Sequence, residues 1–333
     1  MNEVKIVDSN FDKEIFNKIA KHPIQSWQWG NARQETGLEV IRLVEFIDSI
    51  PTKSYEMTIH KLPYIEEKIG YIGMTWLPTN EVIEFLKKLS AEKNLAFIKI
   101  EPDYFVDDPE ISKLNNLNLV KSSSPNFYKY TYVIDLSLDE KRLLSNLKNT
   151  WRYNIGLARR KGVEIVNKDD DEGFETFLKV FLETTKRQHY SGHDAKYHRS
   201  VWSNLKDSMS HILYAKYGED VVAALELFYF NGTLYYPYGG SLPIHRQFKA
   251  PNLLVWEAIM LGKRLGATKF DMWGVAHPDE KDHEWASITE FKSGFGGELK
   301  ELIGSYDLVN NKLVYYIYNI AFSLRKILKK LGS

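Results

Sequence analysis

The sequence predicts a mixed α and β protein of two domains, on the strength of three observations. Apolar residues recur with the 3.6-residue period of helices in some segments and the two-residue period of strands in others. A helix followed by a strand occurs twice, over residues 79–102 and 251–274. The chain of 333 residues is too long for one ordinary hydrophobic core and suits two domains.

The first of these helices covers residues 79–93, TNEVIEFLKKLSAEK, and begins with the N-cap residue Thr79. Asn94 suits the C-cap, and LAFIKIEP then predicts a strand. An apparent strand, IGYIGMTW, precedes the helix. These elements together form one α/β unit.

The second helix covers residues 251–265, PNLLVWEAIMLGKRL, with a proline start and a glycine stop at Gly266. ATKFDMWG follows it as a strand. Before it, VVAALELFYF and TLYYPYGG are joined by Asn231-Gly232, a strong two-residue hairpin turn. The two units indicate two copies of one α/β domain, although their sequence identity does not by itself establish a duplication.

The join between the domains is expected close to Ser137. Ser137-Leu138-Asp139-Glu140 has the spacing of a capping box, which predicts a helix from there to Gly162. The apolar residues of this helix recur every three or four positions and form one stripe, which consists of Leu144, Leu147, Trp151, Ile155 and Ala158.

A second stripe on the same predicted helix is basic. Its members lie within roughly 20° of a common direction on a helical wheel, and they are Lys141, Lys148, Arg152 and Arg159. No Asp or Glu occurs between Lys141 and Val163, whereas soluble helices usually mix signs. Two interpretations stay open: a solvated helix face, or a surface that contacts phosphates.

The composition limits the class of protein. Lys plus Arg and Asp plus Glu balance at 44 each, so any nucleic-acid surface must be a local patch. The absence of cysteine excludes a disulfide framework, a cysteine nucleophile and a Cys-ligated zinc site. The N-terminus does not resemble a signal peptide, and no run of about 18 apolar residues predicts a transmembrane helix, so we expect a cytoplasmic protein.

Histidines gather in RQHYSGHDAKYH, which contains His189, His193 and His198. Ser191-Gly192 interrupts any single helix face and HExxH is absent, so the pattern gives little support to a zinc site. HPDEKDHE, at residues 277–284, is expected to be a polar loop. The chain also lacks the motifs of serine hydrolases, P-loop NTPases and dinucleotide-binding enzymes.

TEFKSGFGGEL, at residues 289–299, places Phe291 and Lys292 just before three glycines in four residues. Glycines bare the backbone N–H groups and permit positive φ angles. A cation beside such backbone suits a phosphate or a developing oxyanion. The alternative is a bulged strand whose lysine points to solvent.

Residues 311–333 lack acids and carry five basic residues among Tyr, Ile, Leu and Phe; they are Lys312, Arg325, Lys326, Lys329 and Lys330. This composition is typical of a helix on a membrane surface, or of a helix that packs against a domain with its basic end complementing the helix dipole. We favour packing, because core burial needs the same apolar residues.

Nearly end to end, the chain resembles the Fem family of peptidoglycan-bridge aminoacyltransferases. The stretches that carry the resemblance are QSWQWGNAR at residues 25–33, AFIKIEP, DLSLDEKRLLSNLKNTWRYNIGLARRKGVEI, ETTKRQHY, YPYGGS, WEAI, KFDMWGV and EFKSGFGGEL. No single stretch identifies the family, but their order and spacing over most of the chain are specific to it.

The resemblance implies two tandem GNAT-like domains, at residues 1–138 with 306–333 and at residues 139–305. It implies transfer of an amino acid, namely Gly, Ala or Ser, from aminoacyl-tRNA to the stem-peptide amine of UDP-MurNAc-pentapeptide or lipid II. The ester is already activated, so no cofactor or metal is implied. We expect a monomer that serves peptidoglycan biosynthesis, and hence cell shape, with peripheral contact with the inner membrane face.

By position, the resemblance places Arg33, Tyr197 and Tyr238 at the cleft for the precursor. His193 stands where relatives have an arginine that grips the precursor, so Arg187 is expected to share that task. The paired-helix arm of longer members is missing, since no two long heptad helices interrupt the second domain.

The resemblance also places Phe291 and Lys292 beside the aminoacyl ester, with Lys292 as a fixed cation on the ester carbonyl or on the 3′-terminal tRNA backbone. Two other functions fit parts of the sequence. A GNAT enzyme that uses acyl-CoA should show an Arg/Gln-x-x-Gly-x-Gly/Ala turn before a helix, which the chain lacks. A non-catalytic protein that binds cell-wall precursor or RNA would need no turnover.

Overall fold

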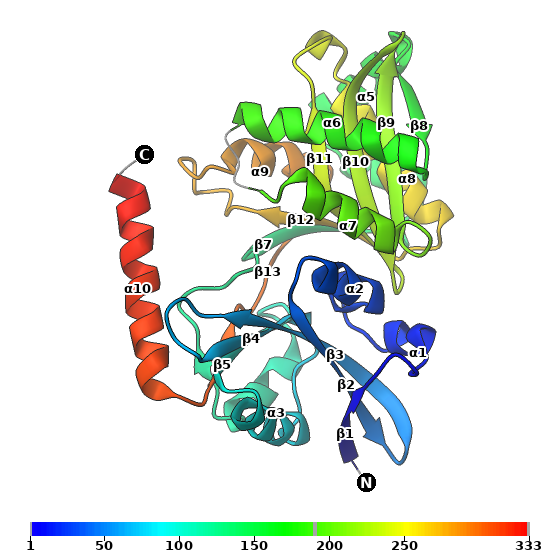
Figure 1. Ribbon diagram of the computed structural model, residues 1–333. Coiled ribbons are helices and arrows are strands. Elements are labelled where there is room, and N and C mark those ends of the chain that lie inside the picture. Colours follow the sequence, from blue (N-terminus) through cyan, green and yellow to red (C-terminus); the bar gives the residue numbers. More distant parts are fainter. Residues whose placement is uncertain (1, 189–191, 332–333) are drawn as a thin grey trace. The chain divides into compact units, whose positions relative to one another are not determined.

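The computed structural model describes residues 2–188 and 192–331. The chain divides into two compact units, Met1–Phe127 with Ile303–Ser333, and Tyr128–Leu302 (Figure 1). The boundary after Phe127 lies before the expected join, because β7 (Tyr130–Asp135) pairs with strands of the second unit. Each unit contains a seven-stranded sheet.

The sheet of the first unit has one parallel pair, β4 and β5, among its described strands, and the other neighbours are antiparallel. In spatial order the strands are β1 (Asn2–Val7), β2 (Glu39–Ile47), β3 (Ile50–Lys61), β4 (Lys68–Thr75), β5 (Leu95–Pro102), β14 (Tyr306–Val309) and β6 (Val120–Lys121).

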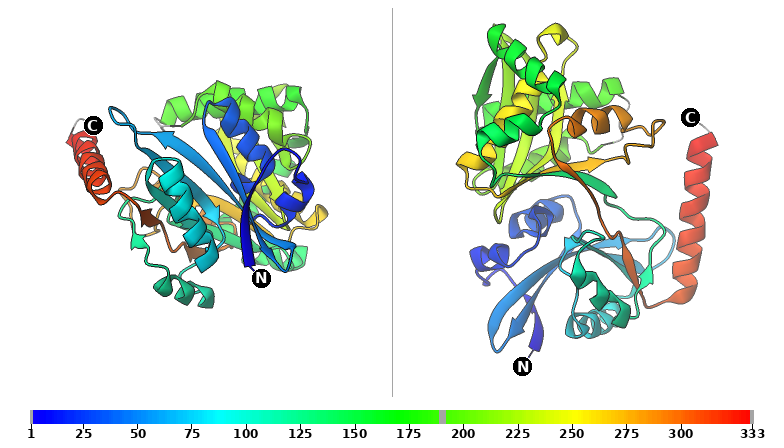
Figure 2. Two further views of the ribbon diagram at one scale, coloured as in Figure 1. Left: turned by 60° about the horizontal axis from the view of Figure 1, so that its bottom comes forward. Right: turned by 180° about the vertical axis from the view of Figure 1, so that it is seen from behind.

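Helix α3 (Asn80–Glu92) joins β4 to β5 and covers one face of this sheet (Figure 2). The Thr79 hydroxyl accepts a hydrogen bond from the Val82 N–H, so the expected N-cap is confirmed. The C-cap is Lys93, one residue before the predicted Asn94, which follows it in the left-handed region with a φ of 54°. The remaining helical segments of the unit are α1 (Lys13–Lys18), η1 (Pro23–Gln25), α2 (Trp27–Glu35), η2 (Pro109–Asn116) and α10 (Lys312–Leu331).

The sheet of the second unit repeats this plan, with a parallel pair, β11 and β12, joined by α8 (Ala250–Arg264). In spatial order its strands are β13 (Glu298–Glu301), β7, β12 (Lys269–Val275), β11 (Thr233–Ser241), β10 (Asp220–Phe230), β9 (Ser210–Tyr217) and β8 (Glu164–Asn167). Its other helical segments are α4 (Glu140–Asn146), α5 (Asn149–Arg160), α6 (Asp171–Gln188), α7 (Ala195–Leu205), η3 (Arg246–Phe248) and α9 (Ala286–Ser293).

The predicted hairpin between β10 and β11 is confirmed. Asn231 and Gly232 have φ angles of 43° and 79°, and Phe230 pairs with Thr233 across the turn. Successive residues of β10 then point to opposite faces. Leu225 and Leu227 join the core that contains α8, whereas Ala224 joins the cluster formed with α6 and α7.

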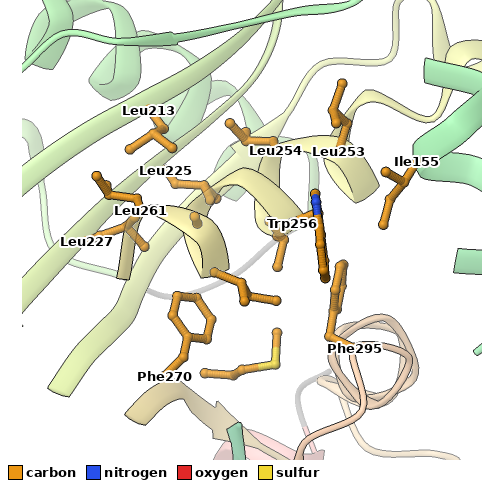
Figure 3. Close-up of a cluster of buried hydrophobic side chains, with 14 of the residues drawn as sticks. Ile155, Leu213, Leu225, Leu227, Leu253, Leu254, Trp256, Leu261, Phe270 and Phe295 are labelled. Atoms are coloured by element: carbon orange, nitrogen blue, oxygen red, sulfur yellow. The ribbon is translucent and has the colours of Figure 1, made fainter. Parts of the chain in front are cut away.

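The α8 side of the sheet carries the larger core. Trp256 of α8 and Phe295, the residue after Gly294, point toward each other there, next to Ile155 of α5 (Figure 3). Other side chains of this core drawn in the same view include Leu213, Leu225, Leu253 and Phe270. This core fixes α5, α8 and the chain after α9 relative to one another within the unit.

The single helix expected from Ser137 to Gly162 is wrong, as is its capping box. Asp139 is the N-cap, with its carboxylate accepting from the Arg142 N–H at 2.7 Å, while the Ser137 hydroxyl donates to Asp135. The chain is extended at Leu147, with a ψ of 147°, so two helices form. The apolar stripe still packs as expected, because each of the two helices keeps its own part of it in the core.

Candidate functional site

Lys292 lies in α9, which packs along β12. The Ala276 N–H donates to the Thr289 hydroxyl at 2.9 Å and ties the helix to the end of the strand. The Lys292 side chain is buried, and its Nζ donates to the Gly274 carbonyl oxygen at 3.0 Å. Nζ also lies 5.1 Å from the centroid of the Tyr236 ring, within cation–π distance.

An irregularity in β12 accompanies this contact. The pairing of β12 with β7 shifts register between Asp271 and Gly274, and Trp273 has a φ of 60°, in the left-handed region. Asp271 stabilises the bend, because its Oδ1 accepts from the Thr131 hydroxyl at 2.6 Å and from the Trp273 N–H at 2.7 Å. Strained backbone of this kind is frequent at functional sites.

Burial changes the proton affinity of both charged groups here. It lowers the pKa of Lys292 to about 7, and the charge of Asp271 opposes that shift. It raises the pKa of Asp271 above its usual value, against the hydrogen bonds from Thr131 and Trp273 and the charge of Lys292. Lys292 therefore exchanges its proton near neutral pH, whereas the sequence led us to expect a permanent cation.

The glycines after Lys292 bring this segment close to the protein's own chain. A Cβ at Gly294 would lie 2.3 Å from the Trp151 ring, and a Cβ at Gly296, whose φ is 78°, would lie 2.7 Å from the Asn146 carbonyl oxygen. The Lys148 N–H donates to the Gly294 carbonyl at 3.0 Å. The alternative of a bulged strand with a solvent-exposed lysine is wrong, since Lys292 is buried in a helix.

Phe291 connects α9 to α5. Its carbonyl accepts from Trp151 Nε1 at 3.1 Å, and its ring lies 6.3 Å from the Trp151 ring and 5.2 Å from that of Phe295. Lys148 Nζ donates to the Ser293 hydroxyl at 2.9 Å. The structure thus brings Phe291 and Lys292 together with Lys148, the first residue before α5.

The other basic residues of the predicted stripe are separated by the break between α4 and α5. Lys141 is exposed on α4. Arg152 Nη1 donates to the Ser145 carbonyl at 3.0 Å and so satisfies the C-terminal end of α4. Arg159 forms an ion pair with Glu257 of α8 at 2.8 Å. Arg152 and Arg159 therefore have structural partners, and one helical wheel no longer relates all four.

A group of aromatic rings joins α6, α7 and β11. His193 stacks on Tyr197 with ring centroids 3.7 Å apart, and Tyr197 meets His198 at 5.5 Å. His198 also lies 4.8 Å from Tyr238 and 4.9 Å from Phe181. The structure thus gathers His193, Tyr197 and Tyr238 around His198.

Arg187 reaches the same strand, β11. Its Nη2 donates to the Ser241 carbonyl at 2.7 Å, while Nε and Nη1 are buried without a hydrogen-bond partner among the described residues. A guanidinium with donors left over suits an anionic or carbonyl ligand. His189, the remaining member of the histidine pattern, lies outside the described residues, and within them no three His, Asp or Glu side chains form a metal-binding group.

Sequence reasoning missed one buried titratable group beside this cluster, Glu226. Glu226 of β10 pairs across the sheet with Tyr238, and its Oε1 accepts from the Ser210 hydroxyl at 2.9 Å. Burial raises the pKa of Glu226 to about 8, and burial lowers the pKa of His198 to about 4. Both groups are neutral at pH 7. A lone charge within VVAALELFYF was the available signal for Glu226.

Glu226→Gln is expected to remove part of the loss of stability at high pH. Folding raises the pKa of Glu226, so its contribution is complete below its unfolded pKa and disappears as pH rises through about 8. The wild type should therefore lose more free energy of unfolding than the variant between pH 5 and pH 9, measured by urea denaturation. Glu219→Gln, at an exposed turn, serves as the control, and equal pH dependence in all three proteins would contradict the burial of a neutral Glu226.

Arg33 lies on α2 of the first unit. Gly30 lets this helix approach β2 and β3, since a Cβ there would lie 1.9 Å from Glu56 Oε2. Glu56 pairs with Arg42 at 3.3 Å, and the Arg42 guanidinium lies 4.1 Å from the Trp27 ring. Burial raises the pKa of Glu56 to about 8, with Arg42 and then Arg33 opposing the shift. Arg33 thus lies on a helix that packs over the buried Arg42–Glu56 pair.

Each unit has a parallel strand pair joined by a helix within a mixed sheet, which defines a protein of two tandem GNAT-like domains. The crystal structure of FemX superimposes with a TM-score of 0.83 at 18% identity, covering 95% of this chain and 99% of that one. A tandem GNAT protein from the clavulanic acid biosynthesis pathway gives a TM-score of 0.52 at 10% identity, covering 93% and 98%.

The sequence model of the FemAB family matches residues 116–216 and 206–323, and the chain belongs to the FemAB family. Among curated proteins, the lipid II:glycine glycyltransferase of Staphylococcus haemolyticus (strain JCSC1435) is 20% identical, with 93% of each chain covered. Within residues 2–188 and 192–331, no helix is long and apolar enough to cross a bilayer.

Proposed function

We propose that this protein is an aminoacyltransferase that moves an amino acid from aminoacyl-tRNA to the stem-peptide amine of a peptidoglycan precursor. Membership of the FemAB family supports the reaction class. The name of the staphylococcal relative supports a lipid-linked acceptor and glycine as one candidate for the transferred residue. The buried Lys292, held against a bent strand, is the feature of the site that best suits acyl transfer.

The proposed chemistry needs position and charge. The stem-peptide amine attacks the ester carbonyl carbon, a new C–N bond forms, and the ester C–O bond breaks. The proton lost by the amine passes to the departing ester oxygen, which becomes the free ribose hydroxyl of the tRNA. In its charged form, Lys292 would stabilise the oxyanion that develops on the carbonyl, and Phe291 would flank the ester. No step requires a cofactor or a metal.

The N-terminus of α5 suits the tRNA backbone. Lys148 is the N-cap residue of this 12-residue helix, and its side chain accepts no hydrogen bond from the first backbone N–H groups. Those N–H groups suit a phosphate. Lys148 itself contacts Ser293, the neighbour of Lys292. A phosphate bound here would lie beside α9, where the aminoacyl end is proposed to bind. Lys141, Arg152 and Arg159 extend the basic surface along α4 and α5.

Replacing Lys141 and Lys148 by Glu is expected to weaken tRNA binding and to flatten its salt dependence. Each phosphate contact contributes a slope of roughly 0.7 to 0.9 in a plot of log affinity against log salt. Filter binding over a salt titration measures this slope. Arg152 and Arg159 are left intact because their internal partners would mix stability with binding, and Lys141→Glu alone separates the effect of charge from the loss of the Lys148–Ser293 hydrogen bond. Lys87→Glu on α3 is the control, and an unchanged slope would return the stripe to a solvated face.

Arg33→Ala and Tyr238→Phe are each expected to raise the KM for the precursor by about tenfold, with a smaller effect on the KM for tRNA. Arginine suits a bidentate grip on phosphate or carboxylate, and the tyrosine hydroxyl supplies one polar contact, worth about 1 kcal/mol or more. Steady-state kinetics with each substrate varied in turn measure the effect. Tyr229→Phe on β10 is the matched control, and equal effects on both substrates would refute this assignment.

The proposed reaction is tested by incubating the protein with glycyl-, alanyl- and seryl-tRNA and with either UDP-MurNAc-pentapeptide or lipid II. Mass spectrometry of the acceptor should show the mass of an added amino-acid residue. It would also identify the residue, the number added and the preferred acceptor. Absence of product with every pair, together with thermal protection by acyl-CoA, would instead support a CoA-dependent GNAT enzyme.

A further inference from the structure

Helix α10 packs on its own unit through one side of its first two turns. Tyr315 and Tyr318 lie with ring centroids 5.2 Å from that of Phe97 on β5, and the Tyr315 hydroxyl donates to Asp307 at 2.9 Å. Val314 joins the same cluster. These contacts come from the first two turns of the helix. The packing that the sequence led us to expect is therefore present on one face of the first two turns of α10.

The opposite face is apolar and open to solvent. Its residues are between 55% and 70% exposed, and they are Leu313, Tyr316, Ile317, Ile320 and Leu324. At 100° per residue they lie within about 60° of one direction, and the packed residues lie on the other side. The sequence continues the same spacing with Ile327, Leu328 and Leu331. The exposed apolar stripe therefore covers residues 313–324 of this 20-residue helix.

The charge of this segment is one-sided. Residues 311–333 contain five Lys or Arg and no Asp or Glu, in a chain whose total charge is zero. A helix with a long apolar stripe and a basic remainder suits the boundary of a bilayer, where the stripe enters the acyl region and the cations meet anionic headgroups. A buried protein interface would place some of these cations against matching acids, and the segment supplies none for a second copy of itself.

We infer that α10 is a membrane-surface helix that docks the protein onto a bilayer containing anionic lipids. The apolar stripe supplies insertion, and the basic residues supply attraction to the headgroups. The inference is independent of the proposed reaction, because binding to lipid requires no substrate. A lipid-linked acceptor, if used, would then be met at the surface where it resides.

The test is co-sedimentation of the full chain with vesicles of phosphatidylglycerol and phosphatidylcholine, compared with phosphatidylcholine alone. We expect binding to the anionic vesicles, weakened by salt. Ile317→Ser combined with Ile320→Ser should reduce the partition coefficient at least about tenfold. Lys326→Glu combined with Lys329→Glu lowers the side-chain charge of the segment from +5 to +1 and should reduce binding to a similar extent.

Ile50→Ser is the matched control, since Ile50 is 66% exposed on β3 of the same unit. It should bind as the wild type does. Thermal unfolding should be unchanged in the isoleucine variants, because the substituted side chains are exposed. Three results would overturn the inference: no binding by the wild type, equal binding by the apolar double variant, or self-association in sedimentation velocity that the same substitutions abolish. The last result would identify a second copy of the chain as the occupant of the stripe.

Discussion

Lys292→Met is expected to lower kcat for aminoacyl transfer by about 100-fold or more, the scale for loss of one oxyanion-stabilising group. Methionine keeps the length of the side chain and removes both the charge and the donor to Gly274. Single-turnover transfer from aminoacyl-tRNA at saturating substrate measures the chemical step. Lys292→Arg should retain part of the rate, because the charge survives while its position changes.

Two further observations make this test discriminating. Lys281→Met, in the exposed polar loop before α9, serves as a control and should transfer at the wild-type rate. The pKa of Lys292 is about 7, so a cationic role predicts that the wild-type rate falls as pH rises above that value. A rate that rises through pH 7 and loses this dependence in Lys292→Met would make the lysine a general base. A near wild-type rate in Lys292→Met would remove it from the mechanism.

Lys292→Met should also increase the free energy of unfolding, by about 1–2 kcal/mol at pH 6. Folding depresses the pKa of Lys292 from 10.5 to about 7, so the cost of burying its charge is complete below pH 7 and declines as pH rises toward 10.5. The gain in free energy of unfolding should therefore be larger at pH 6 than at pH 9, measured by urea denaturation. A stabilised but inactive variant would separate the catalytic role from folding.

Gly294→Ala is expected to destabilise the protein by about 2–3 kcal/mol and to reduce transfer along with stability. The new Cβ would fall 2.3 Å from the Trp151 ring, whose Nε1 is held by the Phe291 carbonyl, so neither group moves without the other. The free energy of unfolding from urea denaturation measures the cost. Because Trp151 joins α5 to α9, the position of Lys292 should change with it.

Gly156→Ala on α5 is the matched control and should have the opposite sign. Its Cβ would meet only the mobile end of Arg160, and alanine is favoured over glycine within a helix by roughly 0.5–1 kcal/mol. Combining Gly294→Ala with Trp151→Leu should cost less than the sum of the single substitutions, because the smaller side chain removes the clash. Additive costs would show that Gly294 is required for another reason.

Local signals were sufficient for much of the fold. Thr79 caps α3 as predicted, the helix ends within one residue of the predicted Asn94, and Asn231-Gly232 forms the β10–β11 turn. Caps and tight turns depend on hydrogen bonds and φ angles within a few residues, so the sequence alone carries them. The order of motifs in turn indicated the FemAB family and tandem GNAT-like domains, both of which the comparisons support.

The break between α4 and α5 is not a local property. Leu147 is buried in the core, and the Lys148 N–H bonds to the carbonyl of Gly294, far along the chain. Periodicity did not reveal it, because two successive helices kept the same apolar stripe. Tertiary contacts with the glycine segment therefore decided where one helix ended and the next began.

The sequence by itself located the segment that carries the candidate site, through the Phe291-Lys292 pair and the glycines that follow it. Only the tertiary structure decided the chemical state of Lys292, because burial in the core lowers its pKa to about 7 even though the charge of Asp271 opposes that shift. The same holds for Glu226 and His198, since burial by the sheet and helices raises the pKa of Glu226 to about 8 and lowers that of His198 to about 4. Desolvation is a sum over neighbours distant in sequence, and no short motif encodes it.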